Sequence, residues 1–310
     1  MSLHDRVIHR LKLRDLRLLL ALNDWGSMAK AATHLNITQS AVSKAIAELE
    51  HTFGVRLFDR TPTGIEPTTY GRALLKGGVA VFDELRQSVN AIEHLADPTA
   101  GELRLGCTEP MSWGIVPNVI DRLVRQHPRL IFHVTEAAPA TLRYHELRER
   151  RIELAIGRVE GPISGDDIDI EVLYNEQYFV VAGRQSRWAG RRKVKLAELV
   201  DEPWSLPAST LVADAFQVSG LPPPRVNAVS YSIPLHNALV ASGHFLTVMP
   251  RSMLQFSAER MSFKVLPVEL PVRLTPVGII TLKNRTPSPV AKFFIDHARE
   301  IAKLLAKNKR

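Results

Sequence analysis

The sequence predicts an α/β fold in three parts: a winged helix-turn-helix, a long helix, and a C-terminal domain of alternating strands and helices. Three observations predict it. Residues 14–60 contain three short helices whose apolar residues recur at helical spacing. Residues 70–96 continue that spacing over a much longer stretch. Beyond residue 102, short β-prone runs alternate with helical patterns, which is typical of a parallel, doubly wound sheet.

The composition fits a soluble globular protein of two or three domains. The 310 residues are 45% hydrophobic and 23% charged, and no run of 18 uncharged apolar residues suggests a membrane span. The N-terminus lacks the apolar core of a signal peptide, and Cys107 is the single cysteine, so we expect a cytoplasmic protein without an intramolecular disulfide. The net charge of +8 is compatible with a nucleic-acid partner but does not by itself indicate one.

The predicted helix-turn-helix and its wing cover residues 11–68. Ser27 and Thr38 stand at N-cap positions before the second and third helices. Each of these helices has a four-residue apolar face at spacing i, i+3, i+4, i+7, made by Met28, Ala31, Ala32 and Leu35 and by Val42, Ala45, Ile46 and Leu49. The β-prone run 54–58 and the turn Thr-Pro-Thr-Gly at 61–64 then predict a small hairpin, or wing.

Residues 69–97 predict a linker helix that pairs two subunits. The proposed dimer contacts lie on one apolar seam and are Leu75, Phe82, Leu85, Val89 and Ile92. About 25 residues at about 1.5 Å each make a rod of roughly 38 Å, whose apolar stripe needs a partner. We favour the same helix of a second subunit, because the segment Asp-Pro-Thr-Ala-Gly at 97–101 ends the helix; packing on the chain's own C-terminal domain is the alternative.

The elements expected in the C-terminal domain fall into two blocks and a return. In the first block strands span 102–107, 130–136 and 152–157, and helices span 114–126 and 141–150. In the second block, which starts near residue 171, strands span 178–183, 205–207 and 246–249, and helices span 196–200 and 235–242. A strand at 275–282 and a helix at 288–306 complete the domain.

The segment from Ser27 to Glu50 resembles the helix-turn-helix of the LysR family of transcription regulators. The run Gly-Val-Arg-Leu-Phe-Asp-Arg at 54–60, followed by Pro67, Thr68 and Gly71, matches the family's wing and the start of its linker helix. The resemblance is close over residues 11–96 and extends beyond them at the level of pattern. It implies a sequence-specific DNA-binding regulator that assembles as a homodimer, and as a dimer of dimers, on operator DNA. RNA polymerase is a further candidate partner.

Eight residues are predicted to contact DNA: Ser27, Thr38, Gln39, Ser40, Ser43, Lys44, Arg60 and Thr68. The inward apolar face of the third helix leaves the polar residues near its N-terminus facing outward, where a recognition helix meets base edges in the major groove. Gln39 carries the amide needed for bidentate contact with adenine, Ser43 can reach a base or a phosphate, and Lys44 suits a phosphate or guanine. Ser40 departs from the family, many of whose members carry proline there. For any one residue alone, a solvated surface position is the alternative.

The C-terminal region resembles the family's effector domain, which is built like a periplasmic solute-binding protein. The resemblance implies two lobes across a cleft, lobe I at 102–161 and 268–310 and lobe II at 162–267. Ligands of such sheets lie beyond the C-terminal ends of strands. The predicted effector contacts are Thr108, Glu109, Ser112, Ala138, Thr141, Arg158, Pro207, Ser209, Thr210, Ser230 and Thr247. Helix capping is the alternative role for several of them. Their small hydroxyls suggest a small organic acid or a sugar-derived effector, and no metal or other cofactor is expected.

Two other functions stay open. Cys107 with a histidine would make an enzyme that carries a DNA-binding anchor, but no catalytic motif supports this pair. Cys107 also alternates with Leu103 and Leu105, which favours a buried core thiol. An architectural DNA binder that needs no effector is the second alternative, and roughly 200 residues of α/β domain argue against it.

Overall fold

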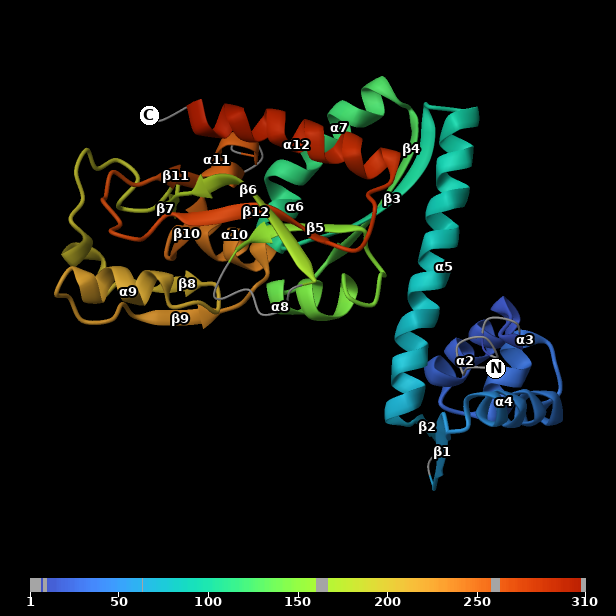
Figure 1. The fold of residues 1–310 in the computed structure, drawn as a ribbon. Coiled ribbons are helices and arrows are strands. Elements are labelled where there is room, and N and C mark those ends of the chain that lie inside the picture. The colour runs from blue at the N-terminus through green and yellow to red at the C-terminus, as the bar shows by residue number, and fades with distance from the viewer. Residues whose placement is uncertain (1–6, 8–9, 63, 160–166, 258–262, 308–310) are drawn as a thin grey trace. The chain divides into compact units, whose positions relative to one another are not determined.

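The computed structural model describes residues 7, 10–62, 64–159, 167–257 and 263–307. Contacts divide the chain into two compact units, residues 1–89 and 90–310, each described below by itself (Figure 1). Within the described residues, no helix combines the length and the apolar character needed to cross a membrane.

The first unit has a three-helix core with a two-stranded wing. Its helices are α2 (Leu13–Trp25), α3 (Met28–Leu35) and α4 (Gln39–Phe53), and its strands are β1 (Phe58–Thr61) and β2 (Gly64–Pro67), which pair antiparallel. The three helices end at Gly26, Asn36 and Gly54, each of which has the positive φ of a left-handed cap. The predicted strand at 54–58 is wrong except for Phe58, because Gly54 ends α4 and the next residues form the turn that leads into β1.

Helix α5 (Thr69–Ala96) follows the wing, and its apolar seam is divided. Leu75 is buried in the core of the first unit, and the half-buried Phe82 packs against the same core. Leu85, Val89 and Ile92 are 42%, 52% and 67% exposed. Leu75 is therefore a core residue of its own unit, which corrects its predicted place among the dimer contacts. Because Leu85, Val89 and Ile92 are exposed, their role as dimer contacts stays a prediction.

The second unit begins with a five-stranded mixed sheet in the order β4-β3-β5-β12-β6. Its strands are β3 (Ala100–Cys107), β4 (Arg129–Glu136), β5 (Leu154–Arg158), β6 (Ile168–Glu176) and β12 (Thr275–Leu282). Strand β3 runs parallel to β4 and β5, whereas β12 runs antiparallel to β5 and β6. The expectation of a parallel, doubly wound sheet is wrong for β12. The chain reaches this strand from β11 of the second sheet, and within the described connection between the two strands no helix packed on the first sheet reverses its direction.

Helices α7 (Ile115–Gln126) and α12 (Pro289–Lys307) supply apolar residues to the core of this first sheet. The short α6 (Glu109–Trp113) precedes α7 and comes directly after β3. The helix predicted at 141–150 is shorter and less regular than expected. It consists of α8 (Pro139–Thr141), a π-helical turn at Leu142–Glu146 and turns up to Arg150, whose φ of 54° ends the segment.

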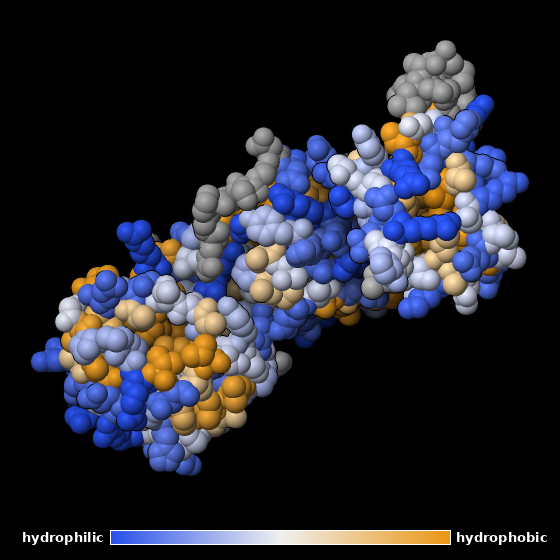
Figure 2. Space-filling view, turned by 90° about the horizontal axis from the view of Figure 1, so that it is seen from below, coloured by the Kyte–Doolittle hydropathy of each residue, from blue (hydrophilic) through white to orange (hydrophobic). Residues whose placement is uncertain are grey.

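The second sheet also has five strands, in the order β11-β7-β10-β8-β9. They are β7 (Tyr178–Gly183), β8 (Trp204–Leu206), β9 (Val226–Val229), β10 (Leu246–Pro250) and β11 (Phe263–Val265). The accompanying helices are a 3₁₀ turn at Leu196–Leu199, α9 (Leu211–Val218), α10 (Ile233–Ala241) and α11 (Arg251–Ser257). Trp204 and Phe216 meet edge to face in its core. Strand β9 is an edge strand, and Figure 2 shows apolar side chains gathered over this lobe, where Val226 and Val229 are exposed.

The chain crosses between the two sheets after β6 and again after β11. Strand β6 ends at Glu176 in the first sheet and β7 begins at Tyr178 in the second, so the first crossing lies here and not at the predicted boundary of 162. The amide of Arg251 donates to the carbonyl of Gln177 (2.8 Å), which ties the start of α11 to this crossing. The predicted return at 268 falls in the connection from β11 to β12.

Candidate functional site

Helix α4 presents a polar, solvent-exposed N-terminal face. The Thr38 hydroxyl caps the helix by accepting a hydrogen bond from the amide of Ala41 (3.2 Å), and it lies 3.0 Å from the Ser40 hydroxyl. Gln39, Ser40 and Lys44 are exposed and Ser43 is half-buried. The opposite face, formed by Val42, Ile46 and Leu49, is buried. The residues predicted to read DNA thus share one accessible surface.

The three other predicted DNA contacts have different surroundings. Ser27 is the N-cap residue of α3, although its side chain makes no capping hydrogen bond. Arg60 is exposed on β1. The Thr68 hydroxyl lies 2.8 Å from the carbonyl oxygen of Arg56 and accepts a hydrogen bond from the amide of Gly71 (3.0 Å). Thr68 therefore joins the wing to the start of α5, a structural role that the sequence did not predict.

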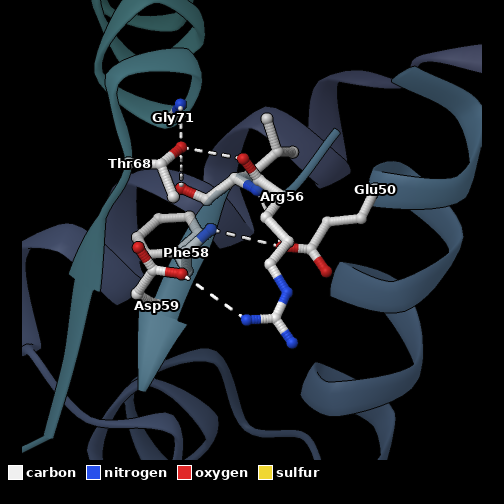
Figure 3. Close-up of polar contacts among 7 residues, drawn as sticks. Glu50, Arg56, Phe58, Asp59, Thr68 and Gly71 are labelled. Atoms are coloured by element: carbon white, nitrogen blue, oxygen red, sulfur yellow. Dashed lines mark hydrogen bonds and ion pairs between the residues drawn. The ribbon is translucent and has the colours of Figure 1, made fainter. Parts of the chain in front are cut away.

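Glu50, in the last turn of α4, fixes the position of the wing. Its Oε1 accepts hydrogen bonds from the amides of Leu57 (2.7 Å) and Phe58 (3.2 Å), as Figure 3 shows for Phe58. Sequence reasoning assigned Glu50 no role. The available signal was a carboxylate near a helix C-terminus, where the helix dipole disfavours negative charge unless a specific donor is present.

Two glycines allow close backbone contacts around the same wing. A Cβ atom on Gly71 would lie 2.0 Å from the carbonyl oxygen of Leu57, so only glycine lets α5 start against this loop. Gly64, with a φ of 151°, would place a Cβ 2.3 Å from the carbonyl oxygen of Gly26. That carbonyl accepts a hydrogen bond from the amide of Ile65 (3.0 Å), which joins the wing to the end of α2.

A cavity of about 300 Å³ lies in the second unit, between residues that follow strands of both sheets. Six of the eleven predicted effector contacts line it: Thr108, Glu109, Ala138, Arg158, Pro207 and Thr247. Several of these residues stand at the C-terminal ends of strands, as the rule expects, and their role in binding an effector stays a prediction.

The other five predicted contacts are not among the residues that line this cavity: Ser112, Thr141, Ser209, Thr210 and Ser230. Local hydrogen bonds involve four of them. The Ser112 hydroxyl lies 2.8 Å from the carbonyl of Glu109, that of Thr210 donates to Asp214 (2.8 Å), that of Ser230 accepts from the amide of Ser232 (2.9 Å), and that of Ser209 accepts from the amide of Leu211 (3.4 Å). The Ser112 hydroxyl also lies 3.0 Å from the carboxylate of Glu136, which does line the cavity. Thr141 is exposed. Turn and helix-end roles, the alternative given for these hydroxyls, fit the four bonded residues.

His236 is a buried cavity residue that the sequence analysis missed. Its Nδ1 lies 2.7 Å from the Ser205 hydroxyl and its Nε2 lies 2.9 Å from the carbonyl oxygen of Ser230. Because a carbonyl only accepts, Nε2 carries the proton and Nδ1 accepts from Ser205. Burial lowers the pKa of His236, so the ring is neutral. An isolated histidine in an apolar helix gave no sequence signal for this role.

The polar groups of the cavity include two charged side chains that are hydrogen-bonded to neutral groups, and two unsatisfied hydroxyls. Glu109 accepts a hydrogen bond from the amide of Ile233 (2.7 Å), the first residue of α10, and Arg158 donates to the hydroxyl of Tyr178 (3.2 Å). Burial and, less strongly, the nearby Glu136 raise the pKa of Glu109 against the effect of that amide. The buried hydroxyls of Thr108 and Thr247 have no hydrogen-bond partner among the described residues.

Cys107 does not have the properties of a catalytic nucleophile. It is fully buried, and burial together with the charge of Glu136 raises the pKa of its thiol to about 12. A thiol acts as a nucleophile only as the thiolate, which such a pKa suppresses. Over the described parts of the chain, no group of three or more His, Cys, Asp or Glu side chains is arranged to hold a metal ion.

Comparison with known proteins gives consistent matches over both units. The model of the bacterial regulatory helix-turn-helix protein, lysR family, matches residues 13–72, and the model of the LysR substrate binding domain matches residues 96–303. The HTH-type transcriptional regulator GbpR of Azospirillum brasilense is 30% identical over 289 residues, covering 91% of this chain and 84% of GbpR.

Two further comparisons agree. The regulator TdcA of Escherichia coli (strain K12) is 26% identical, with 89% of this chain and 88% of TdcA covered. The crystal structure of full-length BenM matches with a TM-score of 0.54 and 25% identity over 97% of this chain and 99% of BenM. These relatives are transcriptional regulators and not enzymes, and the α/β fold with an N-terminal helix-turn-helix is confirmed. The chain belongs to the LysR family of transcriptional regulators.

Proposed function

We propose that this regulator reads a specific operator through the N-terminal face of α4. The observation that carries the proposal is the shared exposure of Gln39, Ser40 and Lys44 opposite a buried apolar face. Gln39 supplies a bidentate amide for adenine, and Ser43 reaches a neighbouring base or phosphate. Thr38, whose hydroxyl is engaged in capping, positions this face and leaves its backbone to approach a phosphate.

Phosphate contacts come from the surroundings of the helix in this proposal. Arg60 on the exposed side of β1 contacts the backbone or the minor groove, and Ser27 and Thr68 lie at helix starts where amides can meet phosphate oxygens. Such contacts orient the protein on the duplex but do not select a sequence. Glu50 acts indirectly, since it holds the wing that carries Arg60.

Self-association through α5 supports binding to two half-sites. The exposed seam of Leu85, Val89 and Ile92 is the proposed dimer contact, extended by the half-buried Phe82. The apolar edge strand β9 offers a second surface for a dimer of dimers. We further propose that the regulator works in the cytoplasm and meets RNA polymerase at the promoter.

An effector in the cavity between the two lobes controls the operator complex in this proposal. The cavity is lined from both sheets and by Tyr178 at the crossing from β6 to β7, so a bound molecule contacts both lobes at once. A ligand that prefers one arrangement of the lobes shifts the population toward it, by no more than its difference in affinity between the arrangements.

The test is binding to the DNA upstream of the regulator's own gene at fixed salt, with random DNA as competitor. The double variant Gln39→Ala, Ser43→Ala should lose preference for the operator by roughly 10- to 1,000-fold and keep weak nonspecific binding. The matched control is His51→Ala, which changes an exposed residue in the last turn of α4. Equal preference in the double variant and the wild type would exclude this reading of the helix.

A further inference from the structure

The lining of the effector cavity carries more acid than base. Glu109 and Glu136 contribute two carboxylates, Arg158 contributes one guanidinium, and His236 adds no charge because burial lowers its pKa. Two negative groups against one positive group leave one negative charge in excess. A ligand with a net negative charge would add to that excess in a partly dehydrated site.

The place where an anion would bind best is already filled by a side chain of the protein. Helix α10 starts at Ile233, and the amide of this residue donates to Oε1 of Glu109 (2.7 Å). A helix N-terminus is a common binding position for an anionic ligand group. Here the carboxylate of Glu109, from the opposite lobe, occupies that position. The contact excludes a ligand carboxylate from the helix end and presents a carboxylate to the cavity.

The cavity also needs a ligand that supplies hydrogen-bond acceptors. Thr108 and Thr247 are buried, come from different lobes, and have hydroxyls with no partner among the described residues. Arg158 adds a guanidinium, whose positive charge attracts a carboxylate. A ligand carboxylate near these three groups would accept hydrogen bonds from the two hydroxyls and be attracted by the guanidinium.

The remaining wall is apolar. It includes Ile233, Val248, Met249 and Met253, together with several prolines. A sugar would place hydroxyls against this wall without partners, which costs free energy for every unsatisfied group. An aliphatic side chain would instead be stabilised there.

We propose, on the basis of the proposed effector function, that this cavity binds a zwitterionic α-amino acid with an apolar side chain. Its ammonium faces Glu109, with Glu136 near by. Its carboxylate is held by Arg158 and the two threonine hydroxyls, and its side chain packs on the isoleucine and methionines. Glu109 is the residue that determines the charge class. The assignment departs from the organic acid or sugar-derived ligand that the sequence suggested.

The first experiment measures ligand affinity of the full-length protein by calorimetry and by the shift in melting temperature. The probes are L-alanine, L-valine, L-leucine, L-isoleucine and L-methionine, with glucose as the neutral polyol. The best amino acid is then compared with its deaminated acid and its decarboxylated amine. We expect both analogues to bind at least about tenfold more weakly, since each lacks one charged contact. Equal binding of the deaminated acid, tighter binding of glucose, or no binding by any of the five amino acids overturns the proposal.

The second experiment uses two variants whose effects differ from general damage. Glu109→Gln should weaken amino-acid binding by roughly 10- to 100-fold and narrow its advantage over the deaminated acid, whereas Glu102→Gln, on the exposed side of β3, should leave both affinities unchanged. Thr247→Val keeps the shape and removes an unsatisfied buried hydroxyl. It should raise the melting temperature without ligand and yet weaken ligand binding. Unchanged affinity in both Glu109→Gln and Thr247→Val contradicts the proposal.

Operator binding without ligand is measured on the same preparations. A protein that prefers its operator but binds none of the amino acids disproves the ligand class alone. A protein that binds an amino acid but shows no preference among DNA sequences supports the ligand class and disproves the proposed reading of DNA.

Discussion

The carboxylate of Glu176 lies 2.5 Å from the hydroxyl of Ser252, so that the last residue of β6 is joined to the first turn of α11. The Ser252 amide also donates to Glu176 (3.1 Å), and Tyr174 donates its hydroxyl to the same carboxylate (3.3 Å). Glu176 is almost fully buried. These bonds join the crossing from β6 to β7 to the start of α11 through an ionisable group.

This carboxylate should make stability depend on pH. Burial raises the pKa of Glu176 above its ordinary value near 4.5, against the opposing effect of the donors from Ser252. A raised pKa in the folded state means that the protonated form is favoured by folding. Its contribution is therefore complete below pH 4.5 and is lost as pH rises through the folded pKa. Glu176→Gln cannot ionise and removes this loss. In urea unfolding from pH 4.5 upward, the free energy of unfolding of the wild type should therefore fall relative to that of the variant. Parallel pH profiles of the two unfolding free energies would contradict the raised pKa of Glu176.

The contact of Glu50 with the wing predicts a specific loss of stability. Glu50→Ala leaves the amides of Leu57 and Phe58 without their acceptor, which should cost about 1–3 kcal/mol in the free energy of unfolding of the DNA-binding unit. The exposed Glu48 is the matched control, because its ion pair with Lys44 spans 4.0 Å and Glu48→Ala should cost no more than about 0.5 kcal/mol. Chemical denaturation measures both. Equal losses of unfolding free energy in Glu50→Ala and Glu48→Ala would mean that the hydrogen bonds of Glu50 to the wing do not stabilise the unit.

The divided seam of α5 predicts that dimerisation and folding can be separated. The double variant Val89→Glu, Ile92→Glu should raise the dimer dissociation constant by roughly 100-fold or more, because charges would be buried in the contact. Gln87→Glu adds a charge on the opposite side of the same helix and should leave the constant unchanged. Leu75→Ala should instead destabilise the unit by about 2–5 kcal/mol. Analytical ultracentrifugation follows the first effect, and a fully dimeric Val89→Glu, Ile92→Glu protein would exclude this seam.

Cys107 should resist thiol reagents in the folded protein. With a pKa of about 12, only roughly one thiol in 10,000 is ionised at pH 8, and the side chain is shielded from solvent. An aromatic disulfide reagent should react at an ordinary rate in 6 M guanidinium and at least about 100-fold more slowly in buffer. A fast reaction of the folded protein would reopen a redox role for this residue.

The fold was predictable where short-range patterns decide it. The apolar spacing of α3 and α4 and the N-cap positions at Ser27 and Thr38 predicted the helix-turn-helix, because each depends on neighbours within one or two turns. The antiparallel insertion of β12 between β5 and β6 was not predictable, since it depends on residues more than a hundred positions apart.

The same division holds for the sites. Thr108 follows β3 and Arg158 ends β5, so their place at strand ends pointed to both, whereas His236 lines the cavity from a helix of the second lobe without any local signal. Thr68 and Glu50 show a second limit. Their side chains bond to backbone atoms of the wing, and such partners cannot be seen from residue types alone.

The position of β12 has a consequence for the order in which the protein forms on the ribosome. Strand β6 joins its sheet only through β12, which is synthesised about a hundred residues later. The helix-turn-helix, in contrast, has its whole core within the first 89 residues. During translation the DNA-binding unit can therefore fold before the sensor domain is complete. A nascent chain halted before Thr275 would carry a folded helix-turn-helix, whereas β6 would lack its partner strand and the effector domain would be incomplete.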